Sequence, residues 1–418
     1  MRVLMVTDAF PPAAGGSGWS TYEVSRALRA RGHEITVVRP RFDSPSSGVE
    51  RYDGFDVLQP RAWAPRMPFV RNYFRNERLY ARLSRMLGPI IRERRIDLVH
   101  AQHLLTGPAA IRAARRAEVP SVCTIRDYWP LCYWSDSTVD PASGAFCPAC
   151  TPRRMMACLP PRGGRVWPLA LAAIPYMTAN LKRKRQALAE ADAVVAVSRR
   201  LAAEIRGRAP ELADTRLEVI PNPVDVDGMT REAASLAAPL AEPYALYVGK
   251  LSPNKGCLHL IDAARASHLD WPLVVVGDGP LRSRMEASAK AAGLDFRFTG
   301  WVPRTEVLTW LRHASLLMFP SAGPESLSRV LLEASAQAVP IAAMDTGGTG
   351  EIVLDNATGL LCEDAAALGS AVARLRADAP LRARLGEAAR EHVRARFDAG
   401  SVALRLEMLY LDLAGAVR

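Results

Sequence analysis

The stretch "LLMFPSAGPESLSRVLLEASAQAVPIAA", residues 316–343, contains the pattern that decides the fold. It begins with an apolar run, Leu316–Phe319, and it ends with a second one, Ile341–Ala343. The segment between them is expected to be a loop followed by a helix that reaches about Ala338. Apolar runs joined by a helix are typical of parallel strands whose sheet is covered on both faces. The stretch therefore predicts a unit of a doubly wound α/β sheet.

Similar apolar runs alternate with helical patterns through the rest of the chain. In the first half the predicted strands are Val3–Val6, Ile35–Val38, Val57–Gln59, Leu98–Ala101, Ser121–Ile125, Ala193–Val197 and Leu217–Ile220. In the second half they are Ala245–Val248, Leu273–Val276, Phe296–Thr299, Leu316–Phe319, Ile341–Ala343 and Gly359–Cys362. The two series predict two doubly wound, Rossmann-like α/β domains with a cleft between them.

The length of 418 residues also favours two domains rather than one core. We assign residues 1–222 to the first domain and 244–398 to the second. The Pro- and Ala-rich segment 223–243 suits a linker, and a C-terminal helix, 399–418, is expected to complete the first domain. The longest apolar segment, 166–177, is too short to span a membrane and the N-terminal apolar run is too short for a signal peptide. We therefore expect a cytoplasmic protein.

Charge and cysteine content leave two questions open. The net charge is +11, and only five of the 54 basic residues are lysines. Binding to nucleic acid is a possibility on this ground but is not the expected function. The predicted insertion 127–165 contains four of the seven cysteines: Cys132, Cys147, Cys150 and Cys158. Four thiolates suit a structural zinc ion, and reduced buried cysteines are the alternative.

Loops at the carboxyl ends of parallel strands are the usual ligand sites of such sheets. After the first strand, Gly15, Gly16 and Gly18 would let a ligand approach the backbone, and the following helix N-terminus favours an anion. A flexible loop is the alternative. The glycine spacing is not the dinucleotide fingerprint, and Arg39 rather than an acidic residue follows the second strand. The pattern therefore disfavours a dinucleotide dehydrogenase.

Lysines and glutamates mark two loops of the second half. Lys250 and Lys255 follow a strand and could neutralise a diphosphate without a metal, although a solvated loop would look the same. Glu325 follows another strand, and Glu333 lies two turns into the helix that Ser326 or Ser328 would cap. The first-turn N–H groups of that helix would face a phosphate. A ligand that carries a sugar, a diphosphate and a ribose could contact both glutamates; two unrelated surface glutamates are the alternative.

A series of motifs runs along the chain. In chain order they are "DAFPPAAGGSG", "IDLVHAQH", "ADAVVAVS", "VIPNPVD", "YVGKLSPNKG", "VVGDGPLR", "FTGWVP", "FPSAGPESLSRVLLEASAQAVPIAA" and "GGTGEIV". The series resembles family 4 glycosyltransferases, which have the GT-B fold, depend on a nucleotide sugar and retain the anomeric configuration. The eighth contains the E-x7-E signature. The resemblance covers nearly the whole chain, and the set in this order is highly specific.

The resemblance implies a role for each candidate residue of the donor site. Glu325 would bind the donor sugar and Glu333 the ribose. The diphosphate would be held by Lys250, Lys255, main-chain groups of Ser326, Leu327 and Ser328, and, from the other domain, Gly15 and Gly16. Trp301 and Val302 would meet the base. The chain departs mildly from its relatives, which usually have glycine near Ser328 and arginine at the position of Lys250.

A larger departure lies in "CTIRDYWPLC", residues 123–132. Relatives commonly have His-Asp where this chain has Arg126 and Asp127. Arginine cannot act as a base near neutral pH, so Arg126 would stabilise charge or bind an acceptor phosphate. His100 and His103 are the acceptor-side alternatives, although each could be a structural histidine. In the mechanism of the family the leaving diphosphate helps to deprotonate the acceptor, and neither a metal nor a protein nucleophile takes part.

The segment 69–95 has the pattern of a basic amphipathic helix. One face carries Arg71, Arg75, Arg78, Arg82 and Arg85, and another carries Tyr73, Tyr80, Leu83, Leu87 and Ile90. Such a helix can bind an anionic bilayer surface, with "LKRKR" (181–185) as a second contact, or it can pack on its own domain.

The sequence therefore predicts a hexosyl-type transferase that acts on a lipid-linked, glycan or small-molecule acceptor, in cell-surface polysaccharide or glycolipid synthesis, at the inner face of a membrane. The alternatives are a GT-B nucleotide-sugar epimerase and a basic membrane- or nucleic-acid-binding protein with a degenerate site.

Overall fold

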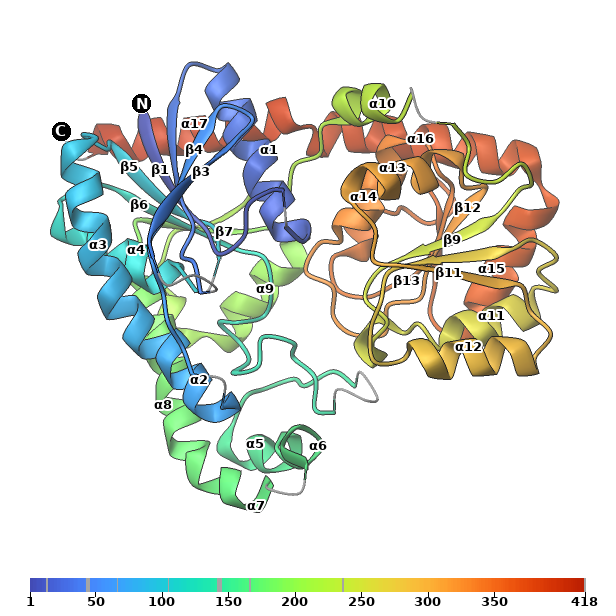
Figure 1. Ribbon diagram of the computed structural model, residues 1–418, viewed down its shortest axis with the longest axis horizontal. Coiled ribbons are helices and arrows are strands. Elements are labelled where there is room, and N and C mark those ends of the chain that lie inside the picture. Colours follow the sequence, from blue (N-terminus) through green and yellow to red (C-terminus); the bar gives the residue numbers. More distant parts are fainter. Residues whose placement is uncertain are drawn as a thin grey trace. The chain divides into compact units, whose positions relative to one another are not determined.

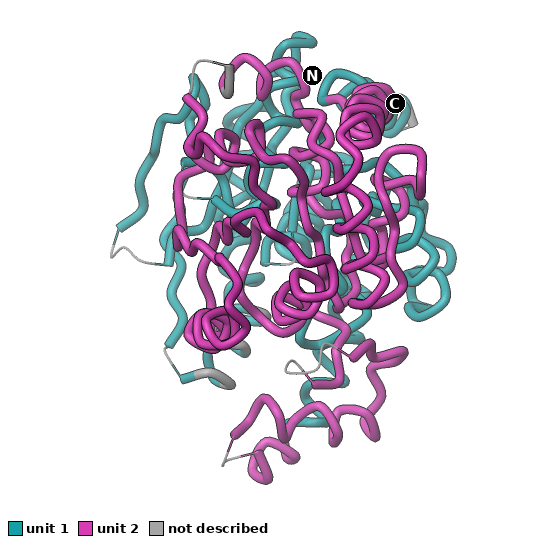
Figure 2. Tube along the Cα trace, turned by 90° about the vertical axis from the view of Figure 1, so that its right-hand side faces the viewer, with its two compact units in different colours: residues 1–135, 173–223, 399–418 teal, residues 136–172, 224–398 magenta. Residues whose placement is uncertain are grey.

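The computed structural model describes residues 1–12, 14–42, 46–65, 67–103, 105–140, 145–164, 167–234 and 237–416. The chain forms two compact units (Figure 2), and each contains one mainly parallel β-sheet with helices packed on it. Unit 1 consists of residues 1–135, 173–223 and 399–418, and unit 2 of residues 136–172 and 224–398. The predicted pair of Rossmann-like α/β domains is thereby confirmed.

The sheet of unit 1 has eight strands in the order β3-β4-β2-β1-β5-β6-β7-β8. The strands are β1 Arg2–Val6, β2 Glu34–Val38, β3 Gly48–Tyr52, β4 Phe55–Gln59, β5 Leu98–Ala101, β6 Ser121–Ile125, β7 Ala193–Ala196 and β8 Leu217–Val219. The central strand β1 pairs in parallel on both sides, with Val3 opposite Ile35 of β2 and Leu98 of β5. Buried apolar side chains fill these strands because helices cover both faces.

Strand β3 is absent from the sequence prediction. It pairs antiparallel with β4, with Tyr52 opposite Phe55. Asp53 and Gly54 form the connecting turn, and both have positive φ angles, 48° and 73°. An Asp-Gly pair in this conformation is the strongest short-range signal of a hairpin, so the dipeptide could have identified the strand.

The helices of unit 1 are α1 Gly16–Ala30, α2 Pro68–Tyr73, α3 Leu79–Glu93, α4 Gly107–Arg116, α8 Ile174–Ala189, α9 Arg199–Arg208 and α17 Ala399–Ala416. Helix α17, the last in Figure 1, belongs to the core of unit 1 although it ends the chain. Its residues Val402, Leu406 and Tyr410 are buried in one cluster with Val3 and Met5.

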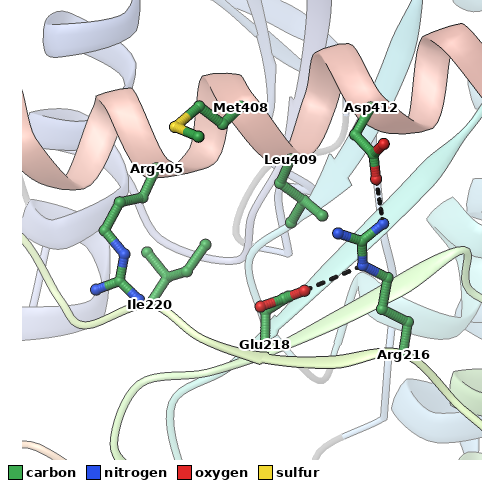
Figure 3. Close-up of a pocket in the computed structure, with 7 residues that line it drawn as sticks. All are labelled: Arg216, Glu218, Ile220, Arg405, Met408, Leu409 and Asp412. Atoms are coloured by element: carbon green, nitrogen blue, oxygen red, sulfur yellow. Dashed lines mark hydrogen bonds and ion pairs between the residues drawn. The ribbon is translucent and has the colours of Figure 1, made fainter.

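A pocket of about 500 Å³ lies between β8 and α17 (Figure 3). Arg216 forms ion pairs there with Glu218, at 3.1 Å, and with Asp412 of α17. Arg405 also lines the pocket, so its two positive and two negative side chains balance, and the Arg216–Asp412 pair ties α17 to the edge of the sheet.

The segment 69–95 is helical, and much of its predicted membrane-facing surface is buried. Helix α2 continues through one π-helical turn, η1 Phe74–Arg78, into α3, which contains Pro89. Tyr80, Leu83 and Leu87 are buried on the side of α3 that packs against α4. These three side chains form part of the protein core, so the prediction that they face a bilayer is wrong.

The sheet of unit 2 has six parallel strands in the order β11-β10-β9-β12-β13-β14. They are β9 Ala245–Val248, β10 Leu273–Val276, β11 Phe296–Gly300, β12 Leu316–Phe319, β13 Ile341–Met344 and β14 Leu360–Cys362. The main helices are α10 Val226–Ala234, α11 His259–Ala266, α12 Arg282–Ala291, α13 Arg304–His313, α14 Arg329–Ala336, α15 Ala365–Ala377 and α16 Ala379–Phe397. The segment 223–243, predicted as a linker, contains α10, which packs on α13, α14 and α16.

The described part of the cysteine-containing insertion contains two short helices, α5 Pro152–Cys158 and α6 Pro160–Gly163, and a third, α7 Trp167–Ala170, follows it. Arg162 holds the start of this insertion in place, because its guanidinium donates to Asp136 at 2.8 Å and to the carbonyl of Val139 at 2.8 Å. In the parts of the chain that the structure describes, no helix is long and apolar enough to cross a membrane.

Candidate active site

The strand order of unit 2 reverses at β9, whose neighbours are β10 and β12. Ligands of doubly wound sheets bind at such a switch point, beyond the carboxyl ends of the strands. The loop after β9 and the loop after β12 pack closely there. Gly323 donates its N–H to the carbonyl of Asn254 at 2.8 Å. Gly256 has a φ of +61°, and a Cβ atom on it would lie 1.8 Å from the carbonyl oxygen of Pro320. Only glycine permits this approach.

This packing brings Lys255 and Glu325 together at the switch point. The Lys255 ammonium donates to Oε1 of Glu325 at 2.6 Å, and the Ser321 hydroxyl donates to the same oxygen at 2.5 Å. The main chain of Glu325 is held by the loop after β13, because Gly348 donates its N–H to the Glu325 carbonyl at 2.8 Å. Glu325 is 8% exposed, and these contacts fix its carboxylate in position before any ligand binds.

Glu333 is held by two arginines inside unit 2. Its Oε1 accepts from Arg304 at 2.5 Å and from Arg329 at 2.8 Å. Burial alone would raise the pKa of Glu333, but the two guanidinium groups outweigh burial and lower it. The carboxylate is therefore ionised at neutral pH and its Oε1 is engaged. The sequence reasoning missed Arg304, which starts α13, because no local spacing links it to Glu333.

The other donor-site candidates lie in loops at the same edge of the sheet. Lys250 is exposed directly after β9, and Val302 is half-buried after β11, beside an exposed Trp301. Ser328 occupies the N-cap position of α14 without a side-chain capping bond, preceded by Ser326 and a buried Leu327. Helix α14 ends at Ala336, slightly earlier than predicted.

Unit 1 has its own switch point, because β1 lies between β2 and β5. Asp8 follows β1, His103 follows β5, and Asp127 follows β6. The imidazole of His103 lies between the two carboxylates, with Nδ1 2.9 Å from Asp8 and Nε2 3.1 Å from Asp127. Burial opposes its charge, but the carboxylates prevail and raise the pKa of His103 to about 10. His103 is therefore an imidazolium at neutral pH, which cannot act as a base.

His100 is not at this site, and its prediction as an acceptor-side residue is wrong. It is fully buried, with Nε2 2.7 Å from the Thr124 hydroxyl and Nδ1 2.5 Å from the Tyr410 hydroxyl. Burial, with a smaller effect of the Arg126 charge, lowers the pKa of His100 to about 3. It is a neutral core histidine that connects β5 to β6 and α17.

Arg126, a catalytic candidate of the sequence, is also largely buried. Its Nε donates to the Asn222 side chain at 2.9 Å and its Nη1 donates to the carbonyl of Gln102 at 2.8 Å. These contacts join the loops after β5 and β6 to the segment after β8. Arg126 thus positions the loop that carries Asp127.

Comparison with known proteins identifies the family of the chain. The family model "Glycosyltransferase Family 4" matches residues 14–227, and the model "Glycosyl transferases group 1" matches residues 229–392. The chain belongs to glycosyltransferase family 4. It is 27% identical to a glycogen synthase of Mycobacterium tuberculosis, over 98% of this chain and 94% of that protein.

Two solved structures show that the transferase has the GT-B fold. Sucrose-phosphate synthase from Thermosynechococcus elongatus has a TM-score of 0.72 and 21% identity, with 100% of both chains covered. HepE from Anabaena, solved in complex with UDP-glucose, has a TM-score of 0.66 and 17% identity, and covers 99% of this chain and 100% of its own.

The glycines of the first loop of this glycosyltransferase differ in their surroundings. Gly15 is the N-cap residue of α1, and a Cβ placed there meets no described atom within 4 Å. Gly16 is the first helical residue. A Cβ on Gly18 would lie 2.6 Å from Cβ of Ala14, so this glycine is required by packing. Gly15 therefore leaves room beside the helix N-terminus, and Gly18 does not.

The cysteines of the transferase give no metal site in the described residues. Cys132, Cys147 and Cys158 are buried and Cys150 is half-buried, and none forms a disulfide. Across the described ranges, no group of three or more His, Cys, Asp or Glu side chains could hold a metal ion. A structural zinc thus stays a prediction of the sequence.

Proposed function

We propose that this glycosyltransferase transfers a hexosyl group, with retention and without a metal, from a nucleoside-diphosphate sugar to a lipid-linked or glycan acceptor in cell-surface glycan synthesis. The observation that carries the proposal is the Lys255–Glu325 pair at the switch point of unit 2. It combines a cation for a diphosphate with a fixed carboxylate for sugar hydroxyls. The UDP-glucose complex of HepE supports a nucleotide-sugar donor.

The donor roles follow from the chemistry of each group. A diphosphate that binds near Lys255 and Lys250 would be neutralised by their ammonium groups and by the N–H groups that start α14. Glu325 would then accept hydrogen bonds from the sugar. Glu333, ionised between Arg304 and Arg329, would accept from the ribose hydroxyls through its other oxygen.

The acceptor side is assigned to the Asp8–His103–Asp127 cluster of unit 1. Its carboxylates can accept hydrogen bonds from acceptor hydroxyls, whereas the imidazolium cannot accept the proton that the acceptor loses. That proton would pass to the leaving diphosphate. His103 would act as a positioning residue that holds both carboxylates in place.

Association with an anionic membrane surface is a further part of the proposal. Arg78, Arg82 and Arg85 are exposed on η1 and α3. The exposed apolar side chains of this region lie at its N-terminal end instead of along α3: Trp63, Met67, Val70 and Tyr73. The membrane contact would therefore be made by the α2 end.

Sugar transfer from a labelled nucleotide sugar tests the proposal. Glu325→Ala should lower kcat by roughly 100-fold or more, because a group fixed toward the reacting sugar is lost. Glu333→Gln should mainly weaken donor binding, and its amide oxygen can still accept hydrogen bonds from Arg304 and Arg329, which alanine could not.

Glu391→Ala, at an exposed position on α16, is the control. Wild-type turnover by Glu325→Ala would refute the assignment. If the protein bound polyanions in a salt-sensitive manner but transferred no sugar, the alternative of a basic binding protein with an inactive site would be favoured.

A further inference from the structure

A second pocket of unit 1 is not used by the proposed chemistry. It has a volume of about 270 Å³ and is lined by Val70, Tyr73, Tyr133, Ala173 and Tyr176. Helix α2, the loop after β6 and the start of α8 supply these residues. The volume is near the lower end for ligand pockets, so the pocket would hold part of a ligand, and its wall is aromatic and aliphatic.

The three tyrosine rings form a continuous wall. The ring of Tyr176 lies edge-on to Tyr73, at a centroid distance of 6.1 Å, and to Tyr133, at 6.5 Å. The Tyr176 hydroxyl is buried and finds no hydrogen-bond partner among the described residues. Such a donor can be satisfied by a polar atom of a bound molecule.

Each ring of the wall also has a cation near it. Arg78 lies 6.0 Å from the ring centre of Tyr73, and Arg183 lies 5.9 Å from that of Tyr176. The ammonium of Lys184, a fully buried side chain, lies 5.4 Å from the ring centre of Tyr133. Cations over aromatic rings stabilise these contacts. Arg183 is paired with Glu77 at 2.6 Å, so the positive charge beside the apolar hollow comes from Arg78 and Lys184.

A pair of arginines extends this charge toward the acceptor side. Arg71 and Arg75 are one turn apart. Burial is the main cause that lowers the pKa of Arg75, and the positive charge of Arg71 lowers it further. The negative charge of Asp8 acts in the opposite direction. Asp8 also contacts His103, so the Arg75 charge acts on a carboxylate of the proposed acceptor cluster. The π-helical turn η1 contains both Arg75 and Arg78, and such turns are frequent at functional sites.

We propose that this pocket binds the hydrocarbon chain of a lipid phosphate, with the phosphate at Arg71, Arg75 and Arg78. The apolar wall disfavours an inorganic anion alone, and the arginines beside it favour an anionic head group over a neutral lipid. The inference rests on the proposed function in one respect: it names the acceptor as a phosphate-bearing lipid whose sugar end reaches the Asp8–His103–Asp127 cluster.

Calorimetric titration of the full chain, without donor, tests the proposal with three probes: farnesyl phosphate, farnesol and inorganic phosphate. We expect farnesyl phosphate to bind at least about tenfold more tightly than either fragment, since it engages both the pocket and the arginines. If farnesol bound as tightly as farnesyl phosphate, the arginines would not bind the phosphate group. If inorganic phosphate bound as tightly as farnesyl phosphate, the pocket would not bind the hydrocarbon chain.

Variants separate the two parts of the site. Ala173→Trp should fill the pocket and lower the affinity for farnesyl phosphate at least tenfold. If Ala173→Trp does not fold, Tyr73→Ala tests the same wall of the pocket and should also lower the affinity. Arg71→Ala with Arg75→Ala should have a similar effect. Arg112→Ala with Arg116→Ala, an exposed pair with the same spacing on α4, is the matched control. Unchanged affinity in the pocket variants would overturn the proposal.

A last comparison distinguishes this inference from the proposed function. Glu325→Ala should bind farnesyl phosphate like the wild type, because Glu325 belongs to unit 2. Lipid binding without sugar transfer by the wild type would refute the proposed function alone. Transfer to a water-soluble acceptor without lipid-phosphate binding would refute the inference alone.

Discussion

His103 is an ionised histidine between two carboxylates, and this arrangement makes part of the stability depend on pH. Its folded-state pKa, about 10, is above the value of about 6.5 for an unfolded histidine. A group whose pKa is raised by folding contributes stability that is fully present below the unfolded pKa and is lost as the pH rises through the folded pKa. The window for His103 is therefore pH 6.5 to 10.

We predict that His103→Gln destabilises unit 1 most at pH 6 and progressively less up to pH 10. The glutamine keeps polar contacts to the carboxylates but lacks the charge that depends on pH. Thermal unfolding of the wild type and the variant at intervals between pH 6 and pH 10 measures the difference. Exposed His268, which has a φ of 48°, provides the control variant His268→Asn. A difference that stays constant across this range would contradict the charged state of His103.

At the scale of elements, the loops after β9, β12 and β13 build the donor site together. Each loop follows a strand that the sequence identifies by its apolar run. Glu325 and Lys255 were therefore predictable as loop residues at one edge of the sheet. Their contact was not predictable, because it depends on Gly256 and Gly323 packing across 70 residues of chain. The same reason explains why Ser321 was missed.

The apolar patterns of the sequence did not identify strand β3 and did not separate the two histidines of the β5 region. Strand β3 is half exposed and polar, with little of the apolar signal that identified the buried strands. His100 lies in the predicted strand Leu98–Ala101 and His103 two residues beyond it, and the local pattern did not distinguish a core histidine from a site histidine. The position relative to the strand end separates them: β5 is buried along its whole length, so His100 belongs to the core, whereas His103 lies beyond the carboxyl end of the strand.

We predict that Gly347→Ala impairs catalysis through the main chain of Glu325. Gly347 has a φ of +56°, and a Cβ on it would lie 1.9 Å from the carbonyl oxygen of Glu325. Gly293→Ala is the matched control, since Gly293 has a φ of +66° and a Cβ there meets no described atom within 4 Å. The left-handed conformation should cost each variant about 1 kcal/mol of stability, and Gly347→Ala should lose more because its Cβ would collide with the backbone of Glu325. Only Gly347→Ala should also lower kcat, by roughly tenfold or more. Equal activities would contradict the role of this loop.

At the scale of the whole molecule, the chain returns to unit 1 after it has completed unit 2. Helix α17 follows α16 of unit 2, yet its apolar side packs in one cluster with β1, β2 and β5. The strands of unit 1 therefore depend on the last residues of the chain. This dependence distinguishes the two units, because the core of unit 2 is formed by residues between Ala245 and Leu385.

We predict that Leu406→Ala destabilises unit 1 and leaves unit 2 protected. Leu406 is 3% exposed within the core cluster, so its truncation should cost about 2–4 kcal/mol. Leu404→Ala, on the same helix but 43% exposed, is the control and should cost little. Hydrogen exchange should increase in β1 and β5 and stay unchanged in β9 and β12. If exchange increased equally in both sheets, the two units would unfold as one, and α17 would not stabilise unit 1 independently. An unchanged β1 would show instead that the sheet of unit 1 does not need α17.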